Sequence, residues 1–135
     1  MFITGLNSQT NERTIQNQNG NAAVWAGVID DLWKLGKPRG LGGPWKKTQV
    51  KAGVASDPYL MTGYDKKSLA LSSDKDAKLT LEVDIDGTGL WVKYKSFDLV
   101  AGKTHSHTFP EGFSAYWVRA ISSVNANTTA LFTYE

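Results

Sequence analysis

The segment HSHTFPE holds the two histidines of the chain, His105 and His107, followed four residues later by Glu111. Residues two apart on a β-strand point to the same face, so both imidazoles can reach one metal ion, and a carboxylate is a suitable further ligand. In a simpler interpretation, the pair lies on a polar edge strand without a metal. Pro110 and Gly112 favour this second interpretation, because a turn at Glu111 would aim the carboxylate away from the histidines.

The spacing H-x-H-x3-E resembles the first metal motif of cupins. Cupins have a glycine six residues before the first histidine, where this chain has Leu99. They also take a third histidine from a later strand, and this chain has only two. A cupin-like metal-binding protein is therefore kept as the third of three functional hypotheses.

The segment DIDGTGLWVKYK places Asp84, Asp86 and Thr88 at the first, third and fifth positions of an EF-hand-like calcium loop, with Gly89 at the sixth. The twelfth position, where a bidentate glutamate is needed, is Lys95. The segment is interpreted as a hairpin turn, since a calcium ion would need oxygen ligands from other loops. No cofactor is predicted, and calcium or another divalent metal is the alternative.

Hydrolytic and phosphate chemistry have no clear motif. The sequence contains no G-x-S-x-G nucleophile motif. Asp30 and Asp31 are adjacent, so on a strand they point to opposite faces and cannot serve one glycosidase cleft. The segment GLGGPWKK has glycines and lysines without the spacing of a phosphate-binding loop. The sequence therefore favours a protein that is not an enzyme.

Five tryptophans and five tyrosines are many for this length, and flat rings can stack on sugars while nearby polar groups bind the hydroxyls. Trp25 and Trp117 lie in apolar segments and are predicted to be core residues. Trp91 is different, because it projects outward beside Lys93 and Lys95 if its immediate neighbours face inward. These three residues are the first group of ligand-binding candidates.

A second group surrounds the segment LWKLGKPRGLGGPWKK, which is too rich in glycine, proline and lysine for a regular helix or strand. Trp33 and Trp45 bracket this segment, and Tyr59 and Tyr64 follow it. The four rings are candidates for a ligand platform. The more frequent role of a loop tryptophan is to pin the loop to the sheet, and this is the provisional interpretation.

The elements that position these residues are predicted from the apolar pattern. In KLTLEVDID, Leu79, Leu81, Val83 and Ile85 alternate with polar residues, which is the period of a half-buried strand. Residues 86–89 supply a hairpin turn, after which residues 90, 92 and 94 resume the inward face. A bulge near Ser96 would explain why the pattern then changes phase.

Further strands are predicted at SLALS, at KTHSHTF as a polar edge strand, at AYWVRAISSV as a central strand apolar on both faces, and at TTALFTYE. Strands spaced by about eight to twelve residues, without long amphipathic helices, indicate an all-β fold. We predict an antiparallel β-sandwich of about seven to nine strands, Ig-like or jelly-roll-like, as a single domain over residues 1–135.

The beginning of the chain follows another pattern. NAAVWAGVI is predicted to be a buried strand, and DDLWKLG a single helical turn ended by Gly36 and Pro38. Residues 37–61 are predicted to form an irregular crossing with one short strand at KTQVKA. Residues 1–36 are either part of the sandwich domain or an extension left from a preceding domain.

The charge and the composition argue against several classes of protein and of site. A net charge of +2 gives no indication of a nucleic-acid partner, and no apolar run is long enough for a signal peptide or a membrane span. Because the chain has no cysteine, disulfides and thiolate metal sites are excluded. The protein is predicted to be soluble, and its compartment is left open.

The phrases AAVWAGVIDDLWKLGKPRGLGGPWKKTQVKAGVASDPYLMTGYDKKSL and GFSAYWVRA resemble the C-terminal β-sandwich region of large, uncharacterised bacterial proteins, often secreted and marine, that contain a propeller-like region. The resemblance implies that residues 1–36 are the last strands before the sandwich. It also implies a larger parent protein, extracellular or periplasmic if secreted, and an accessory role beside polysaccharide-handling proteins. It supplies no catalytic motif.

Two main functional hypotheses follow. The first is a non-catalytic accessory or binding domain that binds a polysaccharide through exposed aromatic residues. The alternative is a structural or oligomerisation domain without a small ligand, whose partner is a neighbouring domain or a second copy of the chain. A contiguous exposed patch with Trp91 or Trp45 would favour the first hypothesis. Burial of those rings within the fold or at a subunit interface would favour the second.

Overall fold

The computed structural model describes residues 2–4, 13–19, 23–28, 30 and 39–135, which are built from β-strands. The chain divides into two compact units, residues 1–37 and residues 38–135, next to the predicted boundary at residue 36. The strands are β1 (Phe2–Thr4), β2 (Thr14–Gln16), β3 (Ala23–Ala26), β4 (Gly40–Val50), β5 (Tyr59–Leu60), β6 (Lys67–Ser73), β7 (Ala77–Asp84), β8 (Trp91–Leu99), β9 (Thr104–Thr108), β10 (Trp117–Ser122) and β11 (Ala126–Tyr134).

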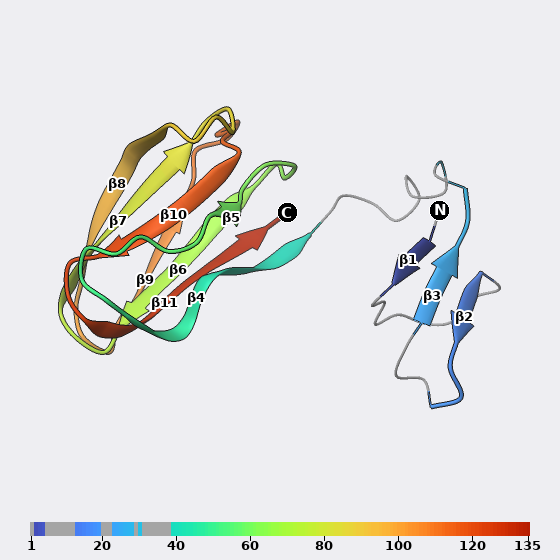
Figure 1. The fold of residues 1–135 in the computed structure, drawn as a ribbon, viewed down its shortest axis with the longest axis horizontal. Coiled ribbons are helices and arrows are strands. Elements are labelled where there is room, and N and C mark those ends of the chain that lie inside the picture. The colour runs from blue at the N-terminus through green and yellow to red at the C-terminus, as the bar shows by residue number, and fades with distance from the viewer. Residues whose placement is uncertain (1, 5–12, 20–22, 29, 31–38) are drawn as a thin grey trace. The chain divides into compact units, whose positions relative to one another are not determined.

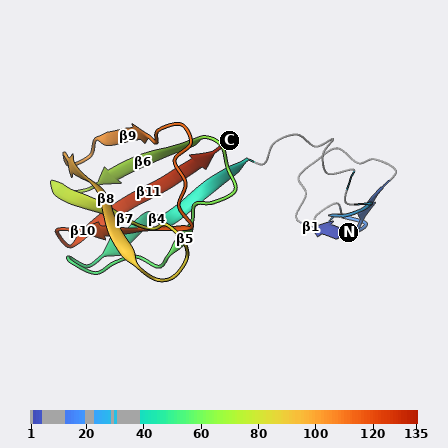
Figure 2. The same ribbon diagram turned by 90° about the horizontal axis from the view of Figure 1, so that it is seen from above.

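The second unit is a sandwich of two four-stranded antiparallel sheets (Figures 1 and 2). One sheet, here the β4 sheet, has the order β4-β11-β6-β9, and the other, the β5 sheet, has the order β5-β10-β7-β8. Successive strands alternate between the sheets except at the β7–β8 hairpin, which is the order of a jelly roll. The predicted all-β sandwich is confirmed, and the strand order selects the jelly roll over the immunoglobulin arrangement.

The first unit contains a three-stranded sheet of order β1-β3-β2 with antiparallel pairs. Its central strand β3 lies within the predicted strand NAAVWAGVI, and Trp25 on this strand is buried, as predicted. The predicted helical turn at DDLWKLG lies outside the described residues except for Asp30.

Strand β7 confirms the strongest sequence pattern, and the predicted hairpin with β8 is present, but Leu90, which was predicted to face inward, is 70% exposed because it precedes β8 in the turn. Leu79, Leu81 and Val83 are buried and face the core. Ile85 was predicted to continue this row but is 62% exposed, because the strand ends at Asp84. Residue 85 therefore belongs to the turn, where the alternation of a strand no longer applies.

The predicted bulge exists but lies elsewhere. Ser96 pairs regularly with Thr80, and the register shifts where Leu81 faces Lys95 and Glu82 faces Lys93. The extra residue is therefore Tyr94, two positions before the predicted bulge. As a consequence, Lys95 shares the core-side face with Leu81, contrary to the prediction that Lys93 and Lys95 both point outward.

The segment GLGGPW was predicted to be irregular but forms the first half of strand β4. A Cβ on Gly43 would collide with the carbonyl oxygen of Ala130, so glycine allows β11 to approach closely. Pro44 is tolerated because β4 is the edge of its sheet and its pairing with β11 has two register shifts. Lys47 adopts φ 52° at this irregularity, and its N–H donates to Thr129 Oγ1 at 3.0 Å.

The core lies between the two sheets and follows the alternation of their strands. Buried and half-buried residues alternate strictly along β6 and β10, so each of these strands has one face toward the core. The side chains that form the core are Trp45, Val50, Met61, Leu69, Leu71, Leu79, Leu81, Val83, Phe97, Leu99, Phe109, Ala115, Val118, Ala120, Ala130, Phe132 and Tyr134.

Candidate functional site

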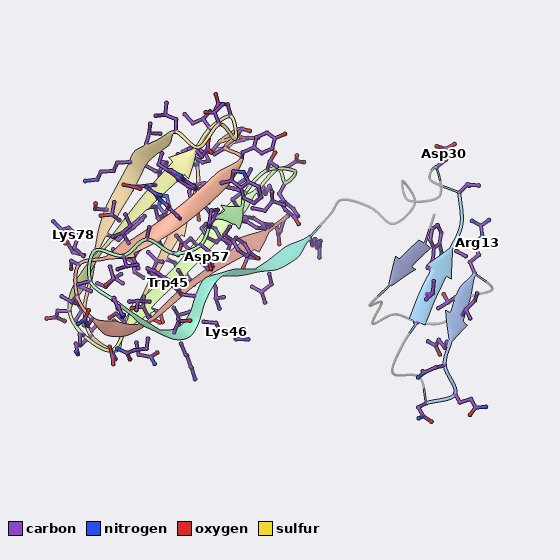
Figure 3. The ribbon with its side chains drawn as sticks, in the orientation of Figure 1. Arg13, Asp30, Trp45, Lys46, Asp57 and Lys78 are labelled. Atoms are coloured by element: carbon purple, nitrogen blue, oxygen red, sulfur yellow. The ribbon has the colours of Figure 1, made fainter. Side chains whose placement is uncertain are left out.

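The second group of predicted ligand-binding residues packs into the fold. Trp45 is 6% exposed and belongs to the core, whereas the neighbouring Lys46 is exposed (Figure 3). Trp45 therefore pins β4 to the sandwich, and only its margin lines a shallow groove of about 300 Å³. Trp33 lies outside the described residues.

Tyr59 and Tyr64 form a ring stack with the C-terminal strand. The Tyr64 and Tyr134 rings are 4.5 Å apart and nearly parallel, and Tyr59 stacks on Phe132 at 5.9 Å. The Tyr134 hydroxyl donates to the carbonyl oxygen of Leu60 at 2.8 Å. Burial, with smaller effects of Tyr59 and Tyr64, raises the pKa of Tyr134 far above its usual value. These tyrosines hold β5 and β11 together.

Trp91 belongs to a row of residues in register across the whole β5 sheet. The register pairs Leu60 with Trp117, Trp117 with Asp84, and Asp84 with Trp91. Val118, Val83 and Val92 form the adjacent row, and Val118 and Val83 are buried in the core. The row that contains Trp91 therefore lies on the outer face, spanning about 14 Å over three strand spacings. Trp117 was predicted to be a core residue, which is wrong, because Val118 and Ala120 take the inward positions.

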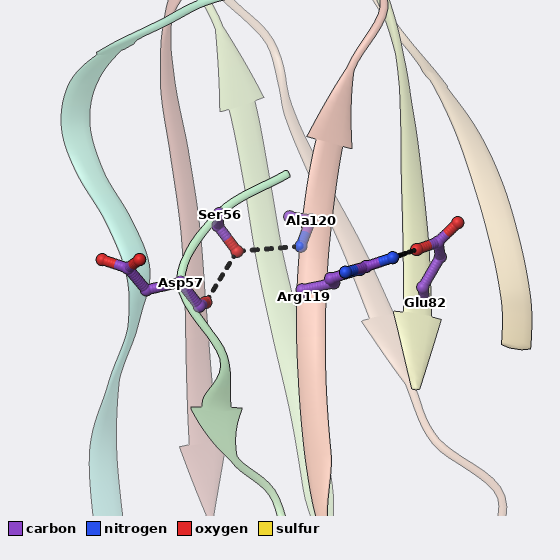
Figure 4. Close-up of polar contacts among 5 residues, drawn as sticks. All are labelled: Ser56, Asp57, Glu82, Arg119 and Ala120. Atoms are coloured by element: carbon purple, nitrogen blue, oxygen red, sulfur yellow. Dashed lines mark hydrogen bonds and ion pairs between the residues drawn. The ribbon is translucent and has the colours of Figure 1, made fainter. Parts of the chain in front are cut away.

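Arg119 connects the two tryptophan strands on this outer face. Its guanidinium carbon lies 4.4 Å from the centre of the Trp91 ring. Its Nε and Nη2 both donate to Glu82 Oε2, at 2.7 and 2.6 Å (Figure 4). We call these two contacts the Arg119–Glu82 fork. They pair the two opposite charges and hold the guanidinium over the indole ring. Trp91 is therefore half-buried, although it points outward from the sheet. Lys93 pairs with Glu82 in the register and is exposed beyond this fork.

The position of β10 is fixed from its other side by Ser56. The Ala120 N–H donates to Ser56 Oγ at 3.0 Å, and Ser56 Oγ donates to the carbonyl oxygen of Asp57 at 2.9 Å (Figure 4). The Ser56 N–H also donates to the carbonyl oxygen of Ala120 at 2.8 Å. Arg119, the residue next to Ala120, therefore projects from a strand whose backbone is held on both edges.

Asp84 supports the turn next to the tryptophans. Although it lies in the outer row, it is buried, and its two carboxylate oxygens accept the N–H groups of Gly87 and Gly89 at 2.9 and 2.8 Å. Asp86 accepts the Thr88 hydroxyl at 2.7 Å, and this hydrogen bond lowers the Asp86 pKa. The oxygens considered for calcium therefore form the hydrogen bonds of the predicted hairpin turn.

Exposed apolar side chains surround this end of the β5 sheet. Leu90 is 70% exposed and Tyr116 is 49% exposed. The Tyr116 N–H donates to the Asp84 carbonyl oxygen at 2.9 Å, which places Tyr116 beside the same turn. We define the tryptophan patch as the outer-row and turn residues Leu60, Ile85, Leu90, Trp91, Tyr116 and Trp117.

Among the patch residues, only Trp91 was predicted from the sequence to be a ligand-binding candidate on the surface. Trp117 and Arg119 lie in AYWVRAISSV, which was interpreted as apolar on both faces. The sequence did contain a signal that Trp117 points outward. Arg119 is charged and lies two residues from Trp117, and residues two apart on a strand share a face, so both belong to one outward face. Leu60 and Tyr116 carry no comparable signal, because only the pairing with β10 and the fold of the turn bring them to this surface.

The histidine pair lies on edge strand β9 with both side chains on one face, as predicted. The register pairs His107 with Leu69 and His105 with Leu71, so this face is the core side. His107 Nε2 and the Tyr94 hydroxyl are 3.0 Å apart. Burial, then the positive charge of Lys95 and the proximity of His105, lower the pKa of His107.

The metal hypothesis for this pair stays a prediction. Glu111 is exposed in the turn after β9. Within residues 2–4, 13–19, 23–28, 30 and 39–135, no group of three or more histidine, aspartate and glutamate side chains is placed to hold a metal ion. In the same part of the chain, no helix has the length and apolarity required to cross a membrane.

Comparisons with known proteins add little to this geometry. No protein-family model matches the sequence, and no curated protein matches it either. A chain from the solved structure titled "Bacillus endospore appendages form a novel family of disulfide-linked pili" is 15% identical, with a TM-score of 0.41. The match covers 73% of this chain and 88% of that chain. A similarity of this degree carries no argument about function, and the resemblance to propeller-containing proteins stays a prediction.

Proposed function

We propose that the sandwich is a non-catalytic structural domain that associates with a second copy of itself through the tryptophan patch. The observation that supports this proposal is the row of Leu60, Trp117 and Trp91 across the outer face of the β5 sheet, continued by the exposed Leu90 and Tyr116. Trp91 and Trp117 are half-buried in this row, so they form an apolar surface that a second copy can cover and not the fully exposed ring platform expected for sugar binding.

The composition of the patch suits a protein interface. Tryptophan, tyrosine and arginine contribute most of the binding energy at such interfaces, and their value increases when they are held rigidly. Arg119 is already fixed by Glu82 and by the Trp91 ring, so little side-chain freedom is lost when the patch is covered.

Charge also permits a second copy as the partner. When a surface meets its own copy across a two-fold axis, an unpaired charge near the axis meets the same charge. In the tryptophan patch, Asp84 is bound by its own turn, and Arg119 and Glu82 neutralise each other. The two copies can therefore meet without burying an unpaired charge from these residues.

The test uses the exposed Leu90, whose replacement leaves the core unchanged. We expect the mass of the wild-type protein, measured by sedimentation equilibrium from micromolar to millimolar concentration, to rise above that of one chain. Leu90→Lys should weaken this association, because two lysines would then face each other. Val54→Lys is the matched control, since Val54 is also exposed but lies in the connection between β4 and β5. A wild type that stays monomeric, or equal masses for the two variants, would overturn the proposal.

Polysaccharide binding at the same patch is the second candidate function. It is supported by the two tryptophans of the row and by the Arg119–Glu82 fork beside them, since rings and planar polar groups together bind sugars. Gel retardation by neutral and acidic soluble polysaccharides tests it. Retardation that is lost in Trp91→Ala would support the carbohydrate hypothesis, and equal mobility with and without every polysaccharide would count against it.

A further inference from the structure

The edge strands of the two sheets in residues 39–135 differ in how they are protected against further pairing. Sheet edges are commonly blocked by proline, charged side chains, bulges or a short strand. Strand β4 has Pro44, two lysines and two register shifts, and β8 has a register shift beside Lys93. Strand β5 has only two residues. Strand β9 has none of these features, because its five residues pair with β6 without interruption and include no proline, lysine, arginine or carboxylate (Figure 2).

The backbone groups at the free edge of β9 belong to alternate residues. The Phe109 N–H donates to the carbonyl oxygen of Lys67, on the β6 side, at 3.0 Å. Because the bonding direction alternates along an antiparallel strand, His107 and His105 also bond toward β6. The residues whose N–H and C=O groups point to the free edge are Thr104, Ser106 and Thr108. A row of alternating donors and acceptors is satisfied by another β-strand, so this edge indicates the kind of partner.

The sequence of β9, THSHT, reads the same in both directions. In an antiparallel pair of two β9 strands, related by a two-fold axis at Ser106, each residue therefore faces a residue of its own type. The two copies of Ser106 would form the central hydrogen-bonded pair, since their N–H and C=O groups point to the edge. Thr104 would face Thr108 of the second copy, and opposed threonines are a favourable cross-strand pair. The partner strand that matches this edge is thus a second copy of β9.

The same register brings four histidines together. His105 and His107 lie on one face of β9, and each would be opposite the other residue of the second copy. Both occupy non-hydrogen-bonded positions, where opposed Cβ atoms are about 5 Å apart, and residues two apart along a strand are separated by about 7 Å. Four imidazoles around so small a rectangle can reach one ion. Imidazole nitrogens are suitable ligands of Zn²⁺, which prefers four ligands in a tetrahedron.

We infer that a Zn²⁺ ion binds between two copies of the chain, held by His105 and His107 of both paired β9 strands. In the described part of a single chain, no three histidine, aspartate or glutamate side chains are placed to hold an ion. The second copy would supply the ligands that one chain lacks. The site lies at the edge of the β4 sheet, and the tryptophan patch lies on the outer face of the β5 sheet, so this inference goes beyond the proposed function.

Two residues of β8 act on this site in opposite directions. The Tyr94 hydroxyl is 3.0 Å from His107 Nε2, so it can accept the Nε2–H and leave Nδ1 to bind the ion. Lys95 Nζ lies 5.5 Å from the centre of the Phe97 ring, on which both histidine rings also pack. Its charge opposes a bound cation, so Lys95→Met should tighten Zn²⁺ binding by about threefold. Lys93→Met is the matched control and should leave the affinity unchanged.

The experiment uses Leu90→Lys as the parent protein, which weakens association through the tryptophan patch. Sedimentation equilibrium should give the mass of one chain in EDTA and of two chains with Zn²⁺, and calorimetric titration should give one ion for two chains. His105→Gln should abolish the zinc-dependent dimer. Ser106→Pro keeps both histidines but removes an N–H that points away from β6, and it should abolish the dimer too. Ser106→Ala is the matched control that should still dimerise, and circular dichroism confirms that each variant is folded.

The results judge this site separately from the proposed function. A zinc-dependent dimer that is lost in both His105→Gln and Ser106→Pro supports the inference. A mass of one chain in the presence of Zn²⁺, a stoichiometry of one ion for each chain, or a dimer that Ser106→Pro retains would overturn it. The proposed function is tested by the wild-type protein in EDTA, where the β9 site holds no zinc and only the tryptophan patch can associate.

Discussion

Replacing Arg119 by methionine tests whether the Glu82–Arg119–Trp91 contacts stabilise the outer face of the β5 sheet. Methionine keeps most of the aliphatic stem, so the loss reports mainly on the guanidinium. The fork with Glu82 has short bonds of 2.7 and 2.6 Å, but the side chains are 29% and 22% exposed, so it contributes about 1 kcal/mol. The contact with Trp91 at 4.4 Å adds about 0.5 kcal/mol.

The expected loss of unfolding free energy is therefore about 1.5 kcal/mol, which lowers the Tm by about 6 °C for a sandwich of this size. Urea unfolding followed by circular dichroism measures it. A double-mutant cycle with Glu82→Gln should give a coupling energy of about 1 kcal/mol. Iodide should also quench the Trp91 fluorescence more strongly, since the ring loses its cover.

A result near zero would refute this reasoning. If Arg119→Met changes the unfolding free energy by less than about 0.3 kcal/mol and the cycle shows no coupling, the fork is a solvent-exposed ion pair without net effect. If stability falls but quenching is unchanged, Arg119 does not shield Trp91. In that case the guanidinium would not be a rigid part of the tryptophan patch.

Three further predictions concern the fold. Gly43→Ala should destabilise the protein by about 2–3 kcal/mol, because its Cβ would collide with the β11 backbone; chemical denaturation measures this loss. Thr128→Val should stabilise it by about 1 kcal/mol, because the buried Thr128 hydroxyl has no hydrogen-bond partner in the described structure; the Tm should rise. The pKa of His107 is lowered from 6.5 in the folded state, so the stability contributed by its neutral form is present above about pH 6.5 and is lost as the pH falls through the lower folded value. The urea midpoint should therefore decrease with decreasing pH, and less so in His107→Gln.

Controls separate these effects from general damage. Gly53→Ala places a Cβ in open space at φ 72°, so it should cost only the backbone strain of about 1 kcal/mol. Equal losses for Gly43→Ala and Gly53→Ala would contradict the collision with β11. Thr129→Val removes a hydroxyl that accepts the Lys47 N–H, and it should destabilise where Thr128→Val stabilises. A pH dependence that is identical with and without His107 would show that other groups carry it.

The strands that the sequence predicted correctly are those in which apolar and polar residues alternate over a few consecutive positions. The predicted inward positions Leu79, Leu81 and Val83 are buried, and the edge strand with His105 and His107 lies where its polar pattern indicated. These features depend on the two-residue period of a strand, which sequence expresses directly. The all-β class follows from the repetition of such segments.

The strand at GLGGPW was not predictable from local propensity. Glycine and proline indicate irregular structure, and only the close approach of β11 at Ala130 and the edge position of β4 make a strand of them. The bulge at Tyr94 was likewise set by the pairing with β7. In both places, contacts with the paired strand outweighed the local preference.

The tryptophan patch shows the same division between sequence and tertiary structure. From the sequence alone, Trp91 was predicted to point outward and Trp117 to lie in the core. The second prediction failed because, in a strand that is apolar on both faces, the sequence does not indicate which face the other sheet covers. Register then aligned Trp117 and Trp91 in one row on either side of β7, and Arg119 reached Trp91 across the same strand. Sequence determines which residues share a face, and the packing of the second sheet decides which face is buried.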